Sequence, residues 1–255
     1  MKRHDLLAAT GLLLVAMFTS TAIAADQPNP DAILKQMSKK LASAKHFSFK
    51  GSREISAAFA ASRGMQAKSE IEVTVRRPNQ VVGRSINRDG VRRLYFDGHN
   101  LTLFDEQENV YSTVPMKTSL DKLPVQLAGQ YGFVPPLADF VISNPYQDFK
   151  LRAQSIAYAG TGMAGTPEVE CHHLALSGTM ADSELWIGVI DSLPRKMTAK
   201  VKGGFAAGTD LTIEFTEWNL KAPVEAQMFV FTPPKDSLLI PMMTAAEIEA
   251  AWNQK

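Results

Sequence analysis

One short cluster in the sequence combines side chains that bind metal ions: Cys171, His172 and His173. Thiolates and imidazoles are ligands of zinc and copper. The cluster lies in a segment with strand character, where neighbouring side chains point to opposite faces, so only Cys171 and His173 can share a site. There is no second cysteine, and beyond residue 24 the only other histidines are His46 and His99. Because a tetrahedral ligand set is incomplete, we expect structural histidines beside a small buried thiol and no metal site.

Two familiar catalytic signatures, the G-x-S-x-G nucleophile elbow and the H-E-x-x-H metalloprotease helix, do not occur in the sequence. The glycines at 160, 162 and 165 do not have the spacing of a phosphate-binding loop, and the carboxylates are scattered. We therefore expect no catalytic residues and no cofactor, and predict that the protein is not an enzyme. A periplasmic enzyme with an unrecognised motif remains an alternative.

The third candidate site is apolar. Between residues 119 and 146 apolar side chains recur at three- and four-residue intervals, which predicts two short helices interrupted at Pro135-Pro136. The side chains concerned are Leu120, Leu123, Leu127, Tyr131, Phe133, Leu137, Phe140 and Val141. Two interpretations use the same residue types: the helices fill the core, or they form a lid over a concave apolar sheet with room for an acyl chain.

The N-terminal residues have the pattern of a secretory signal. Basic Lys2 and Arg3 precede an apolar run over residues 6–18 and a small-x-small site at residues 22–24. The run is shorter than the roughly 20 residues of a membrane span, and no later segment is apolar enough to be one. We predict a signal peptide at residues 1–24, a single domain at residues 25–255 and a periplasmic location.

The charge of the mature chain argues against nucleic-acid binding. Removal of Lys2, Arg3 and Asp5 leaves 25 of the 27 basic and 25 of the 26 acidic residues, so the net charge is zero. Proteins that bind nucleic acid have a basic surface to meet the phosphates.

The elements that must position these residues are mostly strands. An N-terminal helix is predicted at residues 30–44, capped by Asn29 with Pro30 in its first turn. Alternating apolar residues and tight turns predict strands at 46–55, 70–75, 81–86, 93–96, 101–104 and 110–114. After an exposed glycine-rich loop at 160–165, further strands are predicted at 170–177, 183–189, 195–201, 210–216 and 227–231. A capping box, Thr244-x-x-Glu247, predicts a terminal helix.

Several segments carry a family resemblance: Leu185-Trp186-Ile187, Leu193-Pro194-Arg195-Lys196, Trp218 and Phe229-x-Phe231-Thr232-Pro233-Pro234. With the opening helix and the helical insertion, they resemble a family of predicted periplasmic proteins of unknown function that is similar to the lipoprotein carriers LolA and LolB. The resemblance implies a mainly β (α+β) fold: a strongly curved antiparallel sheet, or incomplete β-barrel, whose open side is plugged by helices. In the carriers, that cavity holds acyl chains.

These observations together favour a periplasmic binding protein for a hydrophobic ligand, either a lipid or the acyl chain of a lipoprotein. The ligand would lie between the curved sheet and the helical lid. A non-enzymatic envelope protein-interaction module with a filled core is the main alternative. The sequence leaves the ligand, the partner and the oligomeric state open.

Overall fold

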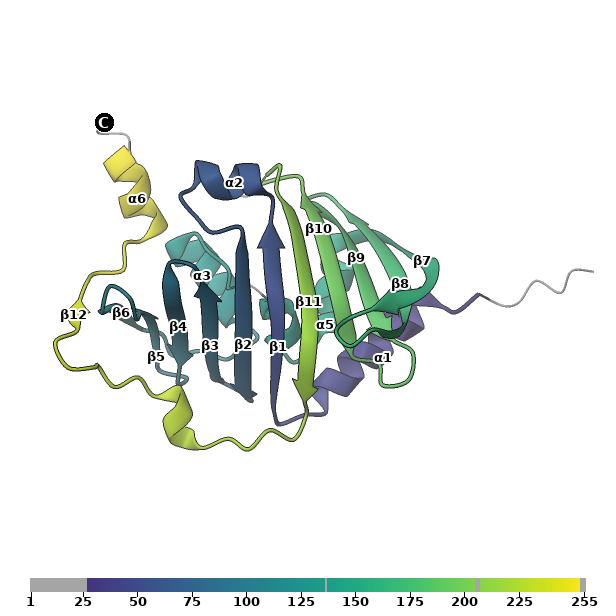
Figure 1. The fold of residues 1–255 in the computed structure, drawn as a ribbon, viewed down its shortest axis with the longest axis horizontal. Helices are drawn as coiled ribbons and strands as arrows, with labels where there is room; N and C mark the ends of the chain where they lie inside the picture. Colours follow the sequence, from purple (N-terminus) through teal and green to yellow (C-terminus); the bar gives the residue numbers. More distant parts are fainter. Residues whose placement is uncertain (1–26, 136, 205–206, 253–255) are drawn as a thin grey trace, which may run out of the picture.

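A computed structural model describes residues 27–135, 137–204 and 207–252 and contains a sheet of twelve strands (Figure 1). The strands are β1 (His46–Ile55), β2 (Lys68–Arg76), β3 (Gln80–Asn87), β4 (Gly90–Phe96), β5 (Asn100–Asp105), β6 (Val110–Pro115), β7 (Ala153–Ala164), β8 (Val169–Gly178), β9 (Ala181–Gly188), β10 (Pro194–Val201), β11 (Asp210–Asn219) and β12 (Leu238–Leu239). The helices are α1 (Pro30–Ala42), α2 (Ala57–Ser62), α3 (Leu123–Tyr131), α4 (Ala138–Val141), α5 (Pro145–Arg152), α6 (Ala245–Trp252) and the 3₁₀ turn η1 (Ala226–Phe229).

The sheet is curved and does not close on itself. Its strand order is β12-β6-β5-β4-β3-β2-β1-β11-β10-β9-β8-β7, with β12 and β7 at the two edges. Neighbouring strands are antiparallel, except that β12 runs parallel to β6. The expected mainly β fold with a curved antiparallel sheet is confirmed, and the word barrel describes its curvature rather than a closed cylinder.

The face of the sheet that the helices cover, called the inner face below, follows from the alternation in the sequence. On β2 the buried residues Ile71, Val73 and Val75 point to this face. They belong to one continuous core with Phe47 and Phe49 of β1 and with side chains of α1, α3, α4 and α5. Figure 1 shows α3 and α5 behind the sheet in that view. The core is therefore a layer of helices packed on one side of the sheet.

The predicted N-terminal helix is confirmed together with its cap. The Asn29 side chain accepts hydrogen bonds from the backbone N–H groups of Asp31 and Ala32, and Pro30 occupies the first turn. The buried side chains Leu34, Met37 and Leu41 are those of the predicted apolar stripe. At the other end of the chain, Thr244 and Glu247 form the predicted capping box of α6.

Three local predictions were wrong. Residues 160–165 are not a free loop, because β7 runs on to Ala164 as a hydrogen-bonded partner of β8. Gly160, with φ of 116°, lies at a bulge in that pairing, where glycine is the favoured residue. The helical insertion has three helices rather than two, since α5 follows α4 directly. Residues 227–231 form no strand: they cross the outer face, where no edge is available to pair with.

The C-terminal segment is held to the outer face by aromatic contacts. Phe231 packs on Tyr95, Phe104 and Tyr111, with ring centroids 5.4, 5.4 and 5.0 Å away. These three partners come from β4, β5 and β6, whose outer face the segment covers. Beyond it, the backbone N–H groups of Leu238 and Ile240 donate to the carbonyls of Asn109, just before β6, and of Tyr111 in β6. The motif that carried the family resemblance therefore has a structural role at Phe231.

Replacing Phe231 with alanine is predicted to loosen the C-terminal segment. Loss of three ring contacts at a partly buried site should lower the free energy of unfolding by about 2 kcal/mol. Chemical denaturation measures the loss, and limited proteolysis should show earlier cleavage after residue 219. Val230→Ala, at the exposed neighbouring residue, is the control. Equal stability of the two variants would show that the ring contacts do not anchor the segment.

Candidate ligand pocket

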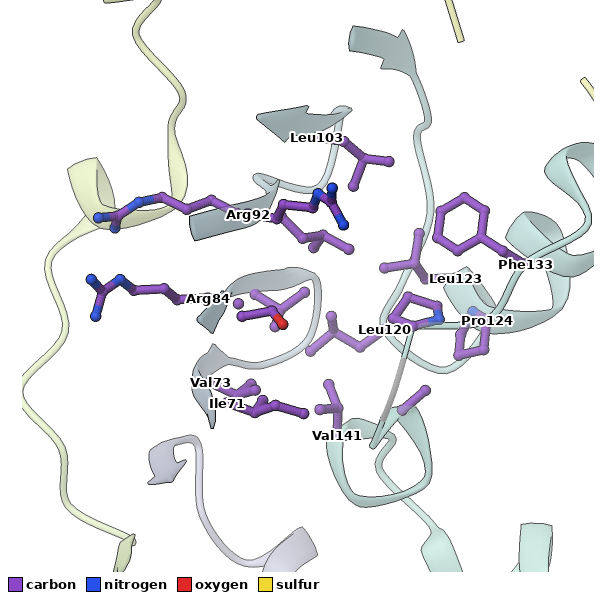
Figure 2. A pocket seen from close by; sticks show the side chains of 17 residues that line it. Ile71, Val73, Arg84, Arg92, Leu103, Leu120, Leu123, Pro124, Phe133 and Val141 are labelled. Atoms are coloured by element: carbon purple, nitrogen blue, oxygen red, sulfur yellow. The ribbon is translucent and has the colours of Figure 1, made fainter. Parts of the chain in front are cut away.

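A pocket of about 220 Å³ lies between the inner face of β2–β5 and the segment that contains α3 and α4. Its floor comes from four neighbouring strands and is mostly apolar, and its roof comes from residues 120–135 and 138–141. Figure 2 shows Ile71, Val73 and Leu103 on the strand side, facing Leu120, Leu123 and Val141. The floor residues are Ile71, Val73, Val81, Gly83, Ser85, Arg92, Leu94 and Leu103. The lining surface is mostly apolar and suits a hydrocarbon group.

The centre of the floor is a glycine. Gly83 lies in the middle of β3, paired with Val73 on one side and Leu94 on the other. A Cβ atom at this residue would meet only the Leu94 Cβ, 4.0 Å away, and its φ is not positive, so neither crowding nor backbone conformation requires glycine there. Glycine inside a strand costs stability and often marks a close approach by a ligand. The missing side chain leaves space in the pocket.

The eight apolar residues expected to form a lid separate into two groups. Leu120, Leu123, Phe133 and Val141 line the pocket. Leu127, Leu137 and Phe140 are buried in the core, and Tyr131 is partly buried against it. Phe140 packs on Phe215 of β11 with ring centroids 5.0 Å apart. The helical segment therefore fills the core with some side chains and roofs the pocket with others, and ligand contact by any of them stays a prediction.

Sequence reasoning missed the whole floor of the pocket. Two signals pointed to it: the strict alternation in β2, which marks Ile71 and Val73 as inner-face residues, and the isolated glycine at 83 in an otherwise continuous strand. Neither signal shows which strands lie opposite the helical insertion, because that depends on the order of strands in the sheet.

The arginines near the pocket point to different faces. Arg84 is paired with Glu72 on the outer face and extends away from the pocket in Figure 2, and Arg93 pairs with Glu106 on that same face. Arg92 shares the inner face with Leu94, and its Nε donates to the Asp105 carboxylate over 2.8 Å. Arg92 and Ser85 are direct cross-strand neighbours at one end of the pocket. The pocket is therefore apolar in its interior and polar at that end.

A partly buried arginine holds the roof on the sheet. Arg77 follows β2, and its two terminal nitrogens donate to the carbonyls of Val141 and Ile142, over 2.7 and 2.9 Å. Its guanidinium also lies over the Phe47 ring, 5.3 Å from the centroid. Burial lowers the pKa of Arg77, and the nearby Asp121 opposes this shift. These bonds fix the end of α4, where Val141 lines the pocket, against the inner face.

The Cys171-His172-His173 cluster lies elsewhere in the sheet, on β8. His173 stacks on Trp186 with ring centroids 4.2 Å apart, and His172 contacts Tyr158. Within the part of the chain that the structure describes, no group of three or more His, Cys, Asp or Glu side chains is arranged to hold a metal ion. Cys171 is fully buried, and this burial raises the pKa of its thiol. The structure gives these residues packing roles.

Substitution of Arg77 by methionine is predicted to release the end of α4. Two charge-assisted hydrogen bonds are lost and two carbonyls lose their partner, which should reduce the free energy of unfolding by about 3 kcal/mol. Urea denaturation gives this value. Arg88→Met, in the exposed β3–β4 turn, removes the same charge as a control. An unchanged stability in Arg77→Met would show that the roof is held by other contacts.

The Cys171 thiol is predicted to resist alkylation in the folded protein. Thiol reagents attack the thiolate, and a raised pKa together with burial keeps both the thiolate population and the access low. Incubation with a maleimide at about pH 7.5, followed by mass spectrometry, should show no label until guanidinium chloride unfolds the chain. Rapid labelling without denaturant would contradict the buried position of the thiol.

The sequence matches a known family over most of its length. Residues 30–243 match the family model described as "Predicted periplasmic protein (DUF2092)". No curated protein matches the chain.

Solved structures similar to the fold are distant in sequence. An uncharacterized conserved protein from Thermus thermophilus is 10% identical with a TM-score of 0.49, covering 82% of this chain and 97% of that chain. A LolA superfamily protein from Nitrosomonas europaea is 12% identical with a TM-score of 0.36, covering 79% and 97%. The Mycobacterium tuberculosis lipoprotein LppX is 9% identical with a TM-score of 0.43, covering 79% and 100%. At these values the likenesses say nothing of ligand or partner.

The predicted signal peptide at residues 1–24 lies outside the described residues. Among those that are described, no helix has the length and apolar character needed to cross a bilayer. The family match confirms the expected relationship and the expected location. The chain belongs to the family of predicted periplasmic proteins DUF2092, and it is a periplasmic protein.

Proposed function

We propose that this protein binds the hydrocarbon chain of a lipid or of an acylated protein in the pocket between β2–β5 and the α3–α4 segment. The observation that carries the proposal is the glycine at the centre of the pocket floor. At Gly83 a side chain that would fit is absent, and the pocket lies against this residue. No catalytic step is part of the proposed function.

The size of the pocket limits what it holds. Pockets for drug-sized ligands measure roughly 300–1,000 Å³, whereas an apolar cavity of about 150 Å³ accepts benzene. A volume of about 220 Å³ therefore suits part of one hydrocarbon chain rather than several. Burial of about eight methylene groups would contribute about 6 kcal/mol before the cost of ordering the ligand. This is enough for reversible binding of a single chain.

The roof of the pocket offers a way for a chain to enter. Phe133 and Pro135 lie in the stretch between α3 and α4, and both line the pocket. This stretch has no regular secondary structure at residues 133–135, and its contact with α4 includes a hydrogen bond of 3.3 Å from the Ala138 N–H to the Pro135 carbonyl. The end of α4 stays fixed by Arg77. We expect ligand entry by movement of residues 133–135, while the end of α4 stays in place.

Substitution of Gly83 by leucine is predicted to fill the pocket and to weaken binding of a hydrophobic probe. The new side chain would occupy the space of the ligand, with a penalty comparable to overpacking a core, so affinity should fall by about tenfold or more. The probe is 1-N-phenylnaphthylamine, whose fluorescence rises in apolar surroundings, titrated into the mature protein.

Gly162→Leu is the matched control, because a Cβ at Gly162 in β7 would meet no atom within 4 Å and its φ is not positive. Equal affinity in both variants would contradict the pocket as the binding site. Native mass spectrometry of protein from a periplasmic extract provides a second test. A protein with no bound lipid, unchanged after incubation with phospholipid and acylated peptide, would favour the protein-interaction alternative.

A further inference from the structure

Among the residues that the structure describes, one arginine on the inner face has no hydrogen-bond or ion-pair partner. Arg53 lies on β1, directly opposite Ser69 of β2, at the rung beyond the Gly51–Ile71 pair. The alternation of β1 and β2 directs both side chains to the inner face, the face of Phe49 and Ile71. In the described ranges Arg53 makes no hydrogen bond and no ion pair, and its Nε is buried.

The side chain opposite Arg53 also lacks a hydrogen-bond partner in the ranges that the structure describes. Ser69 is buried, and its hydroxyl has no hydrogen-bond partner in the described part of the chain. Buried polar groups are nearly always hydrogen-bonded, so two adjacent side chains without partners require an explanation. Directly opposed residues in an antiparallel pair have Cβ atoms about 5 Å apart. One small anion can therefore contact both side chains.

The other two inner-face arginines near the pocket differ from Arg53 because each has hydrogen-bond partners for its charge, although the Arg77 Nε makes no hydrogen bond in the described part of the chain. Arg77 donates to two backbone carbonyls, and Arg92 is paired with Asp105. At Arg53, burial lowers the pKa and no neighbouring carboxylate opposes this shift. Since an arginine side chain remains charged in proteins, its positive charge lacks a counter-charge from the described part of the protein.

The position of this pair relative to the pocket suggests what supplies the counter-charge. Ser69 and the pocket residue Ile71 are two residues apart on one face of β2, a separation of about 7 Å. Ser85 and Arg92, at the rung of Ile71, make the same end of the pocket polar. A ligand with its chain in the pocket would thus place its polar end beside Arg53.

We propose that Arg53 and Ser69 bind the anionic head group, a carboxylate or a phosphate, of the amphiphile whose chain occupies the pocket. This inference rests on the proposed function and names its ligand class as a single-chain anionic amphiphile. Arg53 would form charge-assisted hydrogen bonds with the oxygens of the head group, and the Ser69 hydroxyl would donate another. Neutral lipids of the same chain length are bound less well.

The test compares laurate and dodecyl phosphate with dodecanol, which has the same chain length and no charge. Isothermal titration calorimetry on the mature protein gives the ratio of the anion and alcohol dissociation constants, which is compared between variants. In Arg53→Met this ratio should shift by about tenfold toward the alcohol, while dodecanol affinity stays the same. Arg88→Met removes a nearby charge from the exposed β3–β4 turn at the same end of the sheet and should leave the ratio unchanged.

The possible outcomes separate this inference from the proposed function. If dodecanol binds and Gly83→Leu weakens it, but the ratio is the same in Arg53→Met, the head-group site is refuted and the pocket stands. If no chain binds, both proposals fail. Inorganic phosphate that binds with equal affinity in the presence and absence of dodecanol would show a free-anion site and overturn the assignment to a lipid head group. Circular dichroism confirms that each variant is folded.

Discussion

An unclosed sheet leaves its apolar inner face without strands of its own to cover it. In a closed barrel this face would line the interior, but here β12 and β7 are separate edges, so a second layer is needed to exclude water. The chain supplies that layer at two places: α1 before the first strand, and α3 to α5 between β6 and β7. Their side chains and the inner face form one continuous core.

The covering layer does not fit equally well everywhere. Over β1 and β11, aromatic side chains fill the space, as in the contact of Phe140 with Phe215. Over β2 to β5 the roof spans a floor whose centre is Gly83, and a pocket remains. Arg77 holds the end of α4, the helix that carries both Phe140 of the filled core and Val141 of the pocket roof. The same helical segment thus stabilises the fold and leaves space for a ligand.

The two edge strands of the sheet are protected from unwanted pairing in different ways. The C-terminal segment crosses the outer face, inserts Phe231 among three rings and pairs β12 with the β6 edge. Covering an edge strand in this way removes a template for unwanted pairing. The other edge, β7, carries no charged residue but contains bulges at two places, and bulges twist an edge away from regular pairing.

The sequence alone predicted the elements whose signals are local. The cap at Asn29, the alternation of Ile71, Val73 and Val75, and the capping box at Thr244 each depend on residues within a few positions of one another, and each was found in the structure. Local signals failed where distant partners decided the outcome. Gly160 lies in a strand because β8 pairs with it, and the segment 227–231 forms no strand because the sheet edge is elsewhere.

The candidate site shows the same division. The sequence indicated the apolar side chains of residues 120–141. It did not distinguish those that line the pocket, such as Leu123, from those that lie only in the core, such as Leu127, because both are leucines at helical spacing. Strand order places β2 to β5 beneath them, and only then does Gly83 become the floor of a pocket and Arg53 a cation beside it. Burial and pairing are properties of the whole sheet, because each strand acquires its neighbours and its covering helix from segments far away in the chain.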